Sequence, residues 1–176
     1  MEINKKAKNE ETRLSRLIAN YDWKYNKGKR PEDTEQKYWE VSVEEENWHK
    51  PWNYELEKEL DSDEKKIKGQ SWAEQEHTID EVGSTFTIQG FDLNYAGVIL
   101  GNSVKYQDGK IVYDPKETKH SKVTMRKTLS DGSMQNFAEE LLKHEVRVLM
   151  TRGVNGLYIY ARDKQLREAL LEAMKK

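Results

Sequence analysis

The stretch RVLMTRGVNGLYIYARD, residues 147–163, indicates how the chain folds. An apolar helical run ends at Arg152, a glycine follows directly, and the compact apolar run LYIYA is typical of a strand. Gly153 is the residue type that most often ends a helix, and Asp163 is a good N-cap for a second helix. The stretch therefore predicts a helix, a strand and a helix, with a fixed cation at the first junction.

Apolar periodicity predicts the other elements. We expect strands over 14–23, 39–43, 83–87 and 96–100, a hairpin about Asp108-Gly109, a helix from Ser133 to Gly153 and a helix from Asp163. Residues 96–100 are apolar on both faces, as in a parallel strand that is covered on both sides. The fold class is therefore α/β, with a mostly parallel sheet and a β-hairpin insertion. Ligands of such sheets bind at the carboxyl edge, so we place Arg152 near that edge.

Length and composition favour one domain with long polar segments. Of 176 residues, 35% are hydrophobic and 35% are charged. We expect residues 1–12 to be frayed, 28–70 to form a polar, Trp-rich insertion, and 116–131 to form a mobile basic loop without regular structure. The net charge of -2 means that any contact with nucleic acid must come from a local patch.

Several classes of site are excluded by residue type. The chain has no cysteine, which rules out disulfides and thiolate metal sites, and its four histidines fit no metal spacing. We therefore expect no metal site. Apolar runs are too short for a signal peptide or a membrane span, so we predict a cytoplasmic protein without membrane contact.

Three motifs in chain order resemble a known family. TIQGFDLNYAGVILG, YQDGK and RVLMTRG are similar to the C-terminal motifs of a bacterial family of superfamily-one helicase-like ATPases, which is related to the Schlafen motor domain. SRLIANYDW and PWN extend the resemblance over most of residues 13–170. It implies that residues 1–176 form a single RecA-like three-layer domain, the second motor domain of a helicase-like, nucleic-acid-dependent ATPase.

The resemblance also implies roles for residues. Arg152 matches the arginine finger, which reaches the γ-phosphate of a nucleotide held by the first motor domain; a guanidinium suits this task because it is always charged and donates in a fork. The implied nucleotide-binding residues are Gln89, Gly90, Asp92, Thr151 and Arg16. The implied nucleic-acid-binding residues are Ser84, Thr85 and Thr87. Phe86 stands where many of these helicases have histidine, and Thr87 replaces a common basic residue.

The parts that hold the triphosphate are missing from the chain. No G-x-x-x-x-G-K-[ST] loop occurs, and no apolar strand ends in an Asp-Glu pair. ATP and magnesium therefore belong to the complete protein, and we expect neither to bind this chain alone, which should be inactive. The expected partners are a first RecA-like motor domain with the phosphate-binding loop and single-stranded DNA or RNA. The chain would be a piece of a longer protein or a natural remnant.

Other interpretations stay open at this level. Arg152 could be a cation that the dipole favours at a helix end, and QGFD could be an ordinary turn. Tryptophans in the first half could stack bases or pack the core. The chain would then be a non-catalytic module that binds single-stranded nucleic acid or another protein. The protein-binding alternative is favoured if Arg152 and Asp92 are buried or lie on opposite faces.

Overall fold

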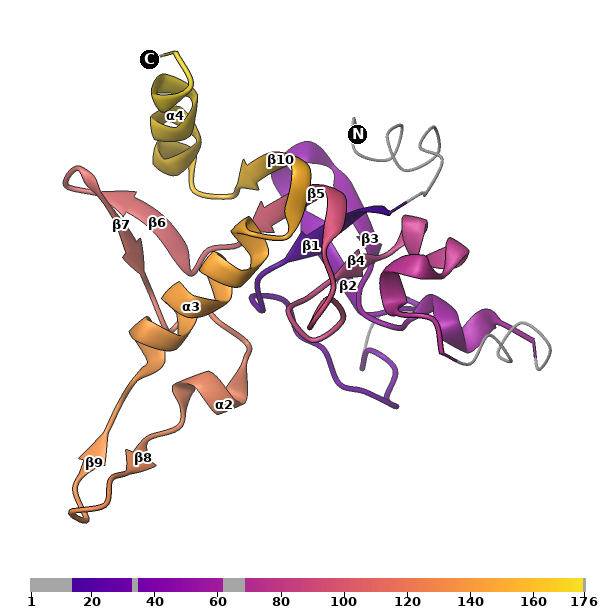
Figure 1. Ribbon diagram of the computed structural model, residues 1–176. Coiled ribbons are helices and arrows are strands. Elements are labelled where there is room, and N and C mark those ends of the chain that lie inside the picture. The colour runs from indigo at the N-terminus through magenta and orange to yellow at the C-terminus, as the bar shows by residue number, and fades with distance from the viewer. Residues whose placement is uncertain (1–13, 33–34, 62–68, 176) are drawn as a thin grey trace.

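A computed structural model describes residues 14–32, 35–61 and 69–175 (Figure 1). Along these residues the strands are β1 (Ser15–Ala19), β2 (Glu40–Val43), β3 (Trp48–Pro51), β4 (Val82–Gly83), β5 (Leu93–Leu100), β6 (Val104–Gln107), β7 (Lys110–Tyr113), β8 (Lys127–Thr128), β9 (Met134–Gln135) and β10 (Gly153–Ala161). The α-helices are α2 (Ser121–Thr124), α3 (Ala138–Met150) and α4 (Lys164–Ala173). Short 3-10 helices are η1 (Glu44–Glu46), η2 (Leu56–Glu59), η4 (Trp72–Glu74) and η5 (Glu76–Asp80). Residues 1–12, predicted to be frayed, lie outside the described ranges.

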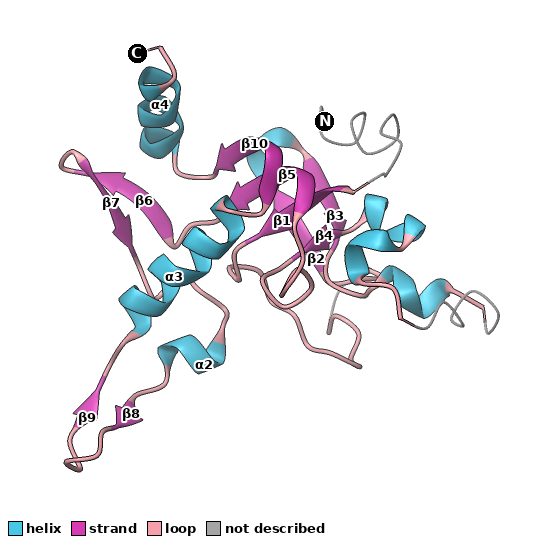
Figure 2. Ribbon diagram, viewed as in Figure 1, coloured by secondary structure: helices cyan, strands magenta, loops and turns pink. Residues whose placement is uncertain are grey.

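A parallel sheet organises the chain, as Figure 2 shows. Its strand order is β10-β5-β1-β4, and each neighbouring pair runs parallel. Strand β5 lies inside this sheet, where Val98 pairs with Ile18 on one side and with Ile159 on the other. The prediction of an α/β, RecA-like fold with a mostly parallel sheet is confirmed.

Each face of the sheet is covered by a different kind of layer. Helices α3 and α4 cover one face, where Leu149 and Leu166 pack in one cluster with Val98. On the opposite face, Val41 and Trp52 pack in one cluster with Ile99. That second layer comes from the antiparallel β2–β3 hairpin and the chain after it. The described part of segment 28–70, which was expected as an insertion, therefore completes the core on this face through β2, β3 and Trp52.

The hairpin about Asp108-Gly109 is confirmed. Strands β6 and β7 pair antiparallel, with Gln107 opposite Lys110. Asp108 and Gly109 both have positive φ, 50° and 78°, which matches the turn that two-residue hairpins prefer. The hairpin projects from the sheet beside α4 (Figure 1), where the Tyr106 N–H donates to the side chain of Asp163, the N-cap of α4, at 3.1 Å.

The region before α3 differs from the expected basic loop and early helix start. Residues 121–124 form α2, and β8 pairs with β9 through a turn at Gly132. Because Met134 belongs to this small hairpin, α3 begins at Ala138 and not at Ser133. The prediction of a stretch without regular structure over 116–131 was wrong.

Two strand and helix boundaries also differ from prediction. Strand β4 stops at Gly83, since the Thr87 side chain accepts the Ser84 N–H at 2.9 Å and folds the chain into a turn. Helix α3 ends at Met150, so Gly153 is not its capping residue but the first residue of β10. A Cβ at Gly153 would lie 2.3 Å from the carbonyl oxygen of Gly156, which shows why a glycine is needed there.

Tryptophans mainly pack the core. At most 8% of the surface is exposed at Trp23, Trp39, Trp52 and Trp72, and Trp48 is half-buried. Base stacking by the four buried side chains is therefore excluded. No helix among the described residues is long and apolar enough to cross a membrane.

Substituting Gly153 with alanine should destabilise the fold. The new methyl group meets backbone atoms that cannot rotate away, so we expect Gly153→Ala to lower the free energy of unfolding by about 2 kcal/mol. Gly109→Ala is the control, because its Cβ would meet nothing within 4 Å and only its φ of 78° is unfavourable. Its expected cost is about 1 kcal/mol. Urea unfolding measures both, and equal stability of Gly153→Ala and wild type would contradict the steric argument.

Candidate functional site

The segment 151–153 between α3 and β10, which we call the elbow, holds Arg152 half-exposed. The guanidinium Nη1 lies 3.1 Å from Asp92 Oδ1 and donates to the carbonyl oxygen of Phe91 at 3.3 Å. Its Nε donates to the carbonyl oxygen of Val148, one turn earlier, at 3.2 Å. Since 23% of the side chain is exposed, solvent and ligands can reach it.

Residues 89–92, which we call the acidic turn, face the elbow. Gly90 has a φ of 74°, and the Phe91 N–H donates to the carbonyl oxygen of Ile88 at 3.1 Å, which closes the turn. Where the turn enters β5, the Leu93 N–H donates to the carbonyl oxygen of Arg152 at 2.8 Å. This backbone bond fixes the distance between turn and elbow, whatever their side chains do.

Several side chains that the sequence singled out thus come together. Gln89, Gly90 and Thr151 are exposed, and 63% of the Asp92 side chain is exposed beside Arg152. The Thr151 hydroxyl donates to the carbonyl oxygen of Arg147 at 3.1 Å. Arg152 and Asp92 are neither sealed inside the fold nor on opposite faces, so the condition that would favour a protein-binding module is not met.

The Arg152–Asp92 contact can be broken at low cost. Ion pairs that are partly exposed contribute about 0–1 kcal/mol, because water solvates the separated charges well. A phosphate with more than one negative charge is a stronger acceptor for a guanidinium than a single carboxylate. The elbow can therefore present Arg152 to an anion that approaches from solvent.

Placing Arg152 near the carboxyl edge of the sheet was wrong. Arg152 precedes β10 and Asp92 precedes β5, and these strands run parallel in register from Gly153 and Leu93. Residues before parallel strands lie at the amino edge. Any ligand at the elbow is therefore held by the segments that enter the sheet.

Arg16 is not available to a nucleotide in this structure. Only 2% of the residue is exposed, within β1. Its Nε donates to the Thr78 hydroxyl at 2.9 Å, and its terminal nitrogens donate to the carbonyl oxygens of Ser15 and Gln75, both at 3.0 Å. The guanidinium ties β1 to the η4–η5 segment, so its role is structural and the predicted phosphate contact is corrected.

The predicted nucleic-acid residues of the STFT run, 84–87, are mostly inside. Ser84 is fully buried and Thr87 is 6% exposed, while Thr85 is half-buried. The Thr87 hydroxyl donates to the carbonyl oxygen of Ser84 at 2.9 Å, and the Ser84 hydroxyl accepts the Phe86 N–H at 3.4 Å. Ser84 and Thr87 therefore shape the turn and do not offer hydroxyls to a phosphate.

Polar residues at the carboxyl edge were missed by the sequence analysis. Asn20 follows β1, donates to the Ser103 hydroxyl at 2.9 Å and accepts the Gly101 N–H at 2.7 Å. Asp22 accepts the Ser103 N–H at 2.7 Å. On α3, Glu145 is buried within the apolar stripe, and its Oε1 accepts the Tyr21 N–H at 2.9 Å. An acid on an apolar helix stripe was the signal that could have revealed Glu145.

Two carboxyl groups at this edge favour their protonated forms. Burial, with a smaller contribution from the charge of Asp22, raises the pKa of Glu145 to about 7, although the hydrogen bond from the Tyr21 N–H lowers it. Burial also raises the pKa of Asp22, although Ser103 and Asn20 partly offset it. Glu145 Oε2 and Asp22 Oδ1 accept no hydrogen bond from the described residues. At the carboxyl edge, burial thus raises the pKa of both carboxyl groups above their ordinary values.

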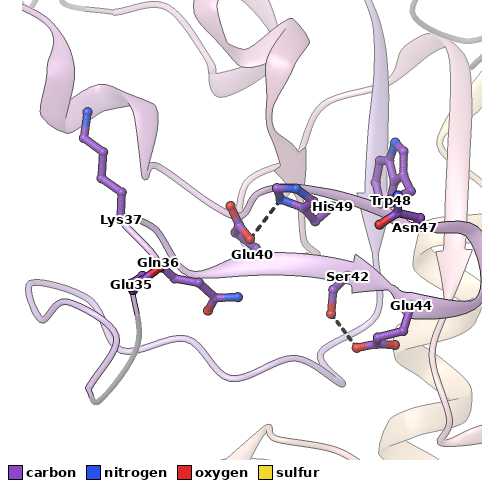
Figure 3. Close-up of a pocket in the computed structure, with 9 residues that line it drawn as sticks. All are labelled: Glu35, Gln36, Lys37, Glu40, Ser42, Glu44, Asn47, Trp48 and His49. Atoms are coloured by element: carbon purple, nitrogen blue, oxygen red, sulfur yellow. Dashed lines mark hydrogen bonds and ion pairs between the residues drawn. The ribbon is translucent and has the colours of Figure 1, made fainter.

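Figure 3 shows a separate pocket of about 540 Å³ on the outer side of the β2–β3 hairpin. Strand β2 turns Val41 and Val43 toward the core, so Glu40 and Ser42 face outward. Glu40 lies 3.0 Å from His49 Nδ1 across the hairpin, and the Ser42 hydroxyl donates to Glu44 at 2.9 Å. The pocket contains no residue of the acidic turn or elbow.

Among the residues that the structure describes, no group of three or more histidine, aspartate or glutamate side chains could hold an ion. The elbow itself offers a partly exposed guanidinium beside an exposed carboxylate.

Comparison with known proteins gives a family and one relative. The family model of the Schlafen group 3 DNA/RNA helicase domain matches residues 1–163. An uncharacterized protein of Saccharomyces cerevisiae, YPL245W, is 46% identical to this chain over 107 residues, which are 60% of the chain and 23% of the yeast protein. The chain thus matches less than a quarter of that relative's length. No solved structure matches the chain. Because the relative is a yeast protein, the bacterial origin stays a prediction.

A double-mutant cycle on Arg152→Ala and Asp92→Ala tests how firmly the guanidinium is held. Because the pair is partly exposed, we expect a coupling energy of about 0.5 kcal/mol in the free energy of unfolding. A coupling above about 2 kcal/mol would show that the pair is a fixed structural element. The cycle is measured by urea unfolding of wild type, both single variants and the double variant.

Glu145→Gln should flatten the pH dependence of stability. A carboxyl with a raised folded pKa binds its proton more tightly in the folded state, so its contribution is complete below its ordinary pKa of 4.5 and is lost as pH rises through about 7. The expected loss in wild type is about 3 kcal/mol. Glu81, whose pKa burial also raises to about 7, should keep part of the slope.

The measurement is urea unfolding at several pH values between 4.5 and 7.5 or so, the range of the raised pKa values. Glu139→Gln, at an exposed acid on the same helix, is the control and should follow wild type. Identical pH profiles of Glu145→Gln and wild type would refute the assignment of a buried, titrating Glu145.

Proposed function

The chain belongs to the family of Schlafen group 3 DNA/RNA helicase domains, and from this membership we propose that it is the C-terminal motor half of a helicase-like ATPase. In this proposal its task is to complete a nucleotide site whose phosphate-binding loop lies on another domain. Arg152 is the arginine finger. The placement among superfamily-one motors belongs to the same proposal.

One observation carries the proposal: Arg152 and Asp92, from segments about 60 positions apart, meet at 3.1 Å on an accessible edge. A guanidinium that only favours a helix C-terminus needs no such partner. Here the elbow fixes the backbone of Arg152 through Leu93, while the side chain has weak, exchangeable acceptors. This combination suits a cation that must reach across an interdomain gap when charge develops on a phosphate.

The neighbouring residues have graded roles in this proposal. Gly90 has a positive φ, and a Cβ at this position would meet no atom within 4 Å. The backbone at Gly90 therefore leaves open space in which a nucleotide could approach it. Gln89 offers an exposed amide and Thr151 a hydroxyl at the same edge. Asp92 holds Arg152 in the nucleotide-free domain and releases it to a stronger anion. Arg16 has no part in this site, since it is buried.

Partners and cofactors follow from what the chain lacks. ATP and magnesium would be held by a first RecA-like domain with a glycine-rich loop, and this chain alone would bind neither well. Nucleic acid would regulate the turnover of the complete protein. Because the chain matches only 23% of its yeast relative, the activity of such a complete protein goes beyond what this domain carries by itself.

Arg152→Ala should abolish ATP turnover in the complete protein. Removing a finger lowers the rate by roughly 10³-fold or more, while nucleotide affinity changes little, since the guanidinium acts mainly in the transition state. Arg152→Lys should also be strongly impaired, because an ammonium cannot donate in a fork. Turnover is measured as phosphate release, and affinity by titration with a fluorescent ATP analogue.

Arg147→Ala is the matched control, because Arg147 is an exposed arginine on α3 that lies outside the elbow. It should turn over ATP like wild type. If Arg152→Ala does the same, Arg152 is not the finger. If Arg152→Ala loses nucleotide affinity in proportion to turnover, it is a ground-state contact.

A further inference from the structure

Phe86 is a large apolar side chain that the fold presents to solvent at the carboxyl edge of the sheet. Of its surface, 53% is exposed, and it follows β4 in the turn that Ser84 and Thr87 close. Several hydrogen bonds hold this turn. The Ser84 carbonyl oxygen accepts the N–H and the hydroxyl of Thr87, the Thr87 hydroxyl accepts the Ser84 N–H, and the Ser84 hydroxyl accepts the Phe86 N–H. The buried hydroxyls thus keep an exposed phenyl ring in place.

Phe86 belongs to a column of rings that reaches from the core to the surface. Its ring centroid lies 5.7 Å from that of Tyr21 and 5.3 Å from that of His120, both at steep angles of 88° and 78°. Tyr21 rests on the fully buried Trp52, with centroids 4.7 Å apart. We call Tyr21, Phe86 and His120 the aromatic platform. Since both neighbours meet Phe86 edge to face, neither of them covers it in a parallel stack.

His120 connects the platform to residues 116–127, which we call the basic segment. This segment carries five lysines and arginines against one glutamate. It is anchored beneath the platform, because the carbonyl oxygen of Tyr21 accepts the Thr118 hydroxyl at 2.9 Å and the Lys119 N–H at 2.8 Å. Burial lowers the pKa of His120, and the charge of Lys122 lowers it further, so the imidazole is neutral at neutral pH.

The cations of the basic segment remain free to meet an external anion. Lys119, Lys122, Arg126 and Lys127 are exposed, and none forms an ion pair with another described residue. The whole chain has a net charge of -2, so attraction of an anion depends on this local positive charge and is strongest for a densely charged ligand. A ligand that also contacts the aromatic platform needs a flat group to stack on the Phe86 ring.

We propose that the aromatic platform and the basic segment form a binding site for single-stranded nucleic acid, in which an unpaired base stacks on Phe86 and the adjacent phosphates contact Lys119 and Lys122. Aromatic rings with basic residues beside them bind single strands in this way, without sequence preference, because every base has a flat face. Base pairs within a duplex do not expose that face, so duplexes bind more weakly.

This inference deepens the proposed function, on which it rests for the class of partner, but it uses different residues at the opposite edge of the sheet. It also replaces the expected contacts of Ser84 and Thr87 with phosphate by a contact of Phe86 with a base. The sequence analysis noted Phe86 only as a departure from histidine. Its exposure and its two ring neighbours became visible only in the fold.

Fluorescence anisotropy of labelled oligomers of about 15 nucleotides tests the site on the 176-residue chain without nucleotide. Oligo-dT and oligo-U arms report whether DNA or RNA is preferred, and a duplex of the same length is the third probe. We expect Phe86→Ala to weaken single-strand binding roughly 5- to 100-fold, the range of one lost base stack. Phe86→Trp should bind like wild type, and Phe86→Leu, which keeps apolar volume, should resemble Phe86→Ala.

Two further variants separate stacking from charge. The double variant Lys119→Ser with Lys122→Ser should bind more weakly and show a smaller salt dependence, because fewer counterions are released. Tyr158→Ala, at an exposed aromatic residue of β10, is the control and should leave binding unchanged. Thermal unfolding tests whether each variant is folded. If Phe86→Ala does not fold, the comparison of Phe86→Leu with wild type tests the stacking contact in its place.

Several outcomes would overturn the inference: no binding of single strands by wild type, equal binding by Phe86→Leu, tighter binding of the duplex, or equal binding of an acidic peptide, which would indicate a protein partner. Arg152→Ala should bind oligonucleotide like wild type. If it does, and also keeps ATP turnover in the complete protein, only the proposed finger fails. If Phe86 variants bind normally while Arg152→Ala loses turnover, only the platform fails.

Discussion

Strands β5 and β10 pair in parallel from their first residues, and this pairing sets the position of the site at Arg152 and Asp92. The bond from the Leu93 N–H to the carbonyl oxygen of Arg152 begins the register and sets the acidic turn against the elbow. Two residues that precede adjacent parallel strands must lie at one edge. Asp92 and Arg152 therefore meet without any attraction between their side chains, and the ion pair only occupies a geometry that the backbone has already fixed.

Helix α3 joins the two edges of the sheet. Near its middle, Glu145 accepts the Tyr21 N–H under the aromatic platform, and its last turn leads into the elbow that holds Arg152. Leu149 packs in one cluster with Val98 of β5, which holds this helix against the sheet.

Local patterns were reliable where a single short-range interaction decides the structure. Asp163 caps α4 by accepting the Leu166 N–H at 2.8 Å, and Asp108-Gly109 turns the β6–β7 hairpin, both as predicted. Patterns failed where a distant segment changes the outcome. Met134 fits a helical stripe, but its strand pairs with β8, and Gly153 resembles a helix cap, but close contact with Gly156 requires it.

The sequence by itself determined the α/β class and the start of α4 at Asp163, because residue type and spacing specify local hydrogen bonds and apolar faces. The candidate pair Arg152 and Asp92 came from the resemblance to helicase motifs. Only the tertiary structure decided which polar groups remain available. Arg16 and Ser84 have residue types suited to phosphate, yet they are buried and bonded to the chain, whereas Phe86 has the type of a core residue and is exposed. Burial depends on which segments pack together across the sheet, and one stretch of sequence does not contain that information.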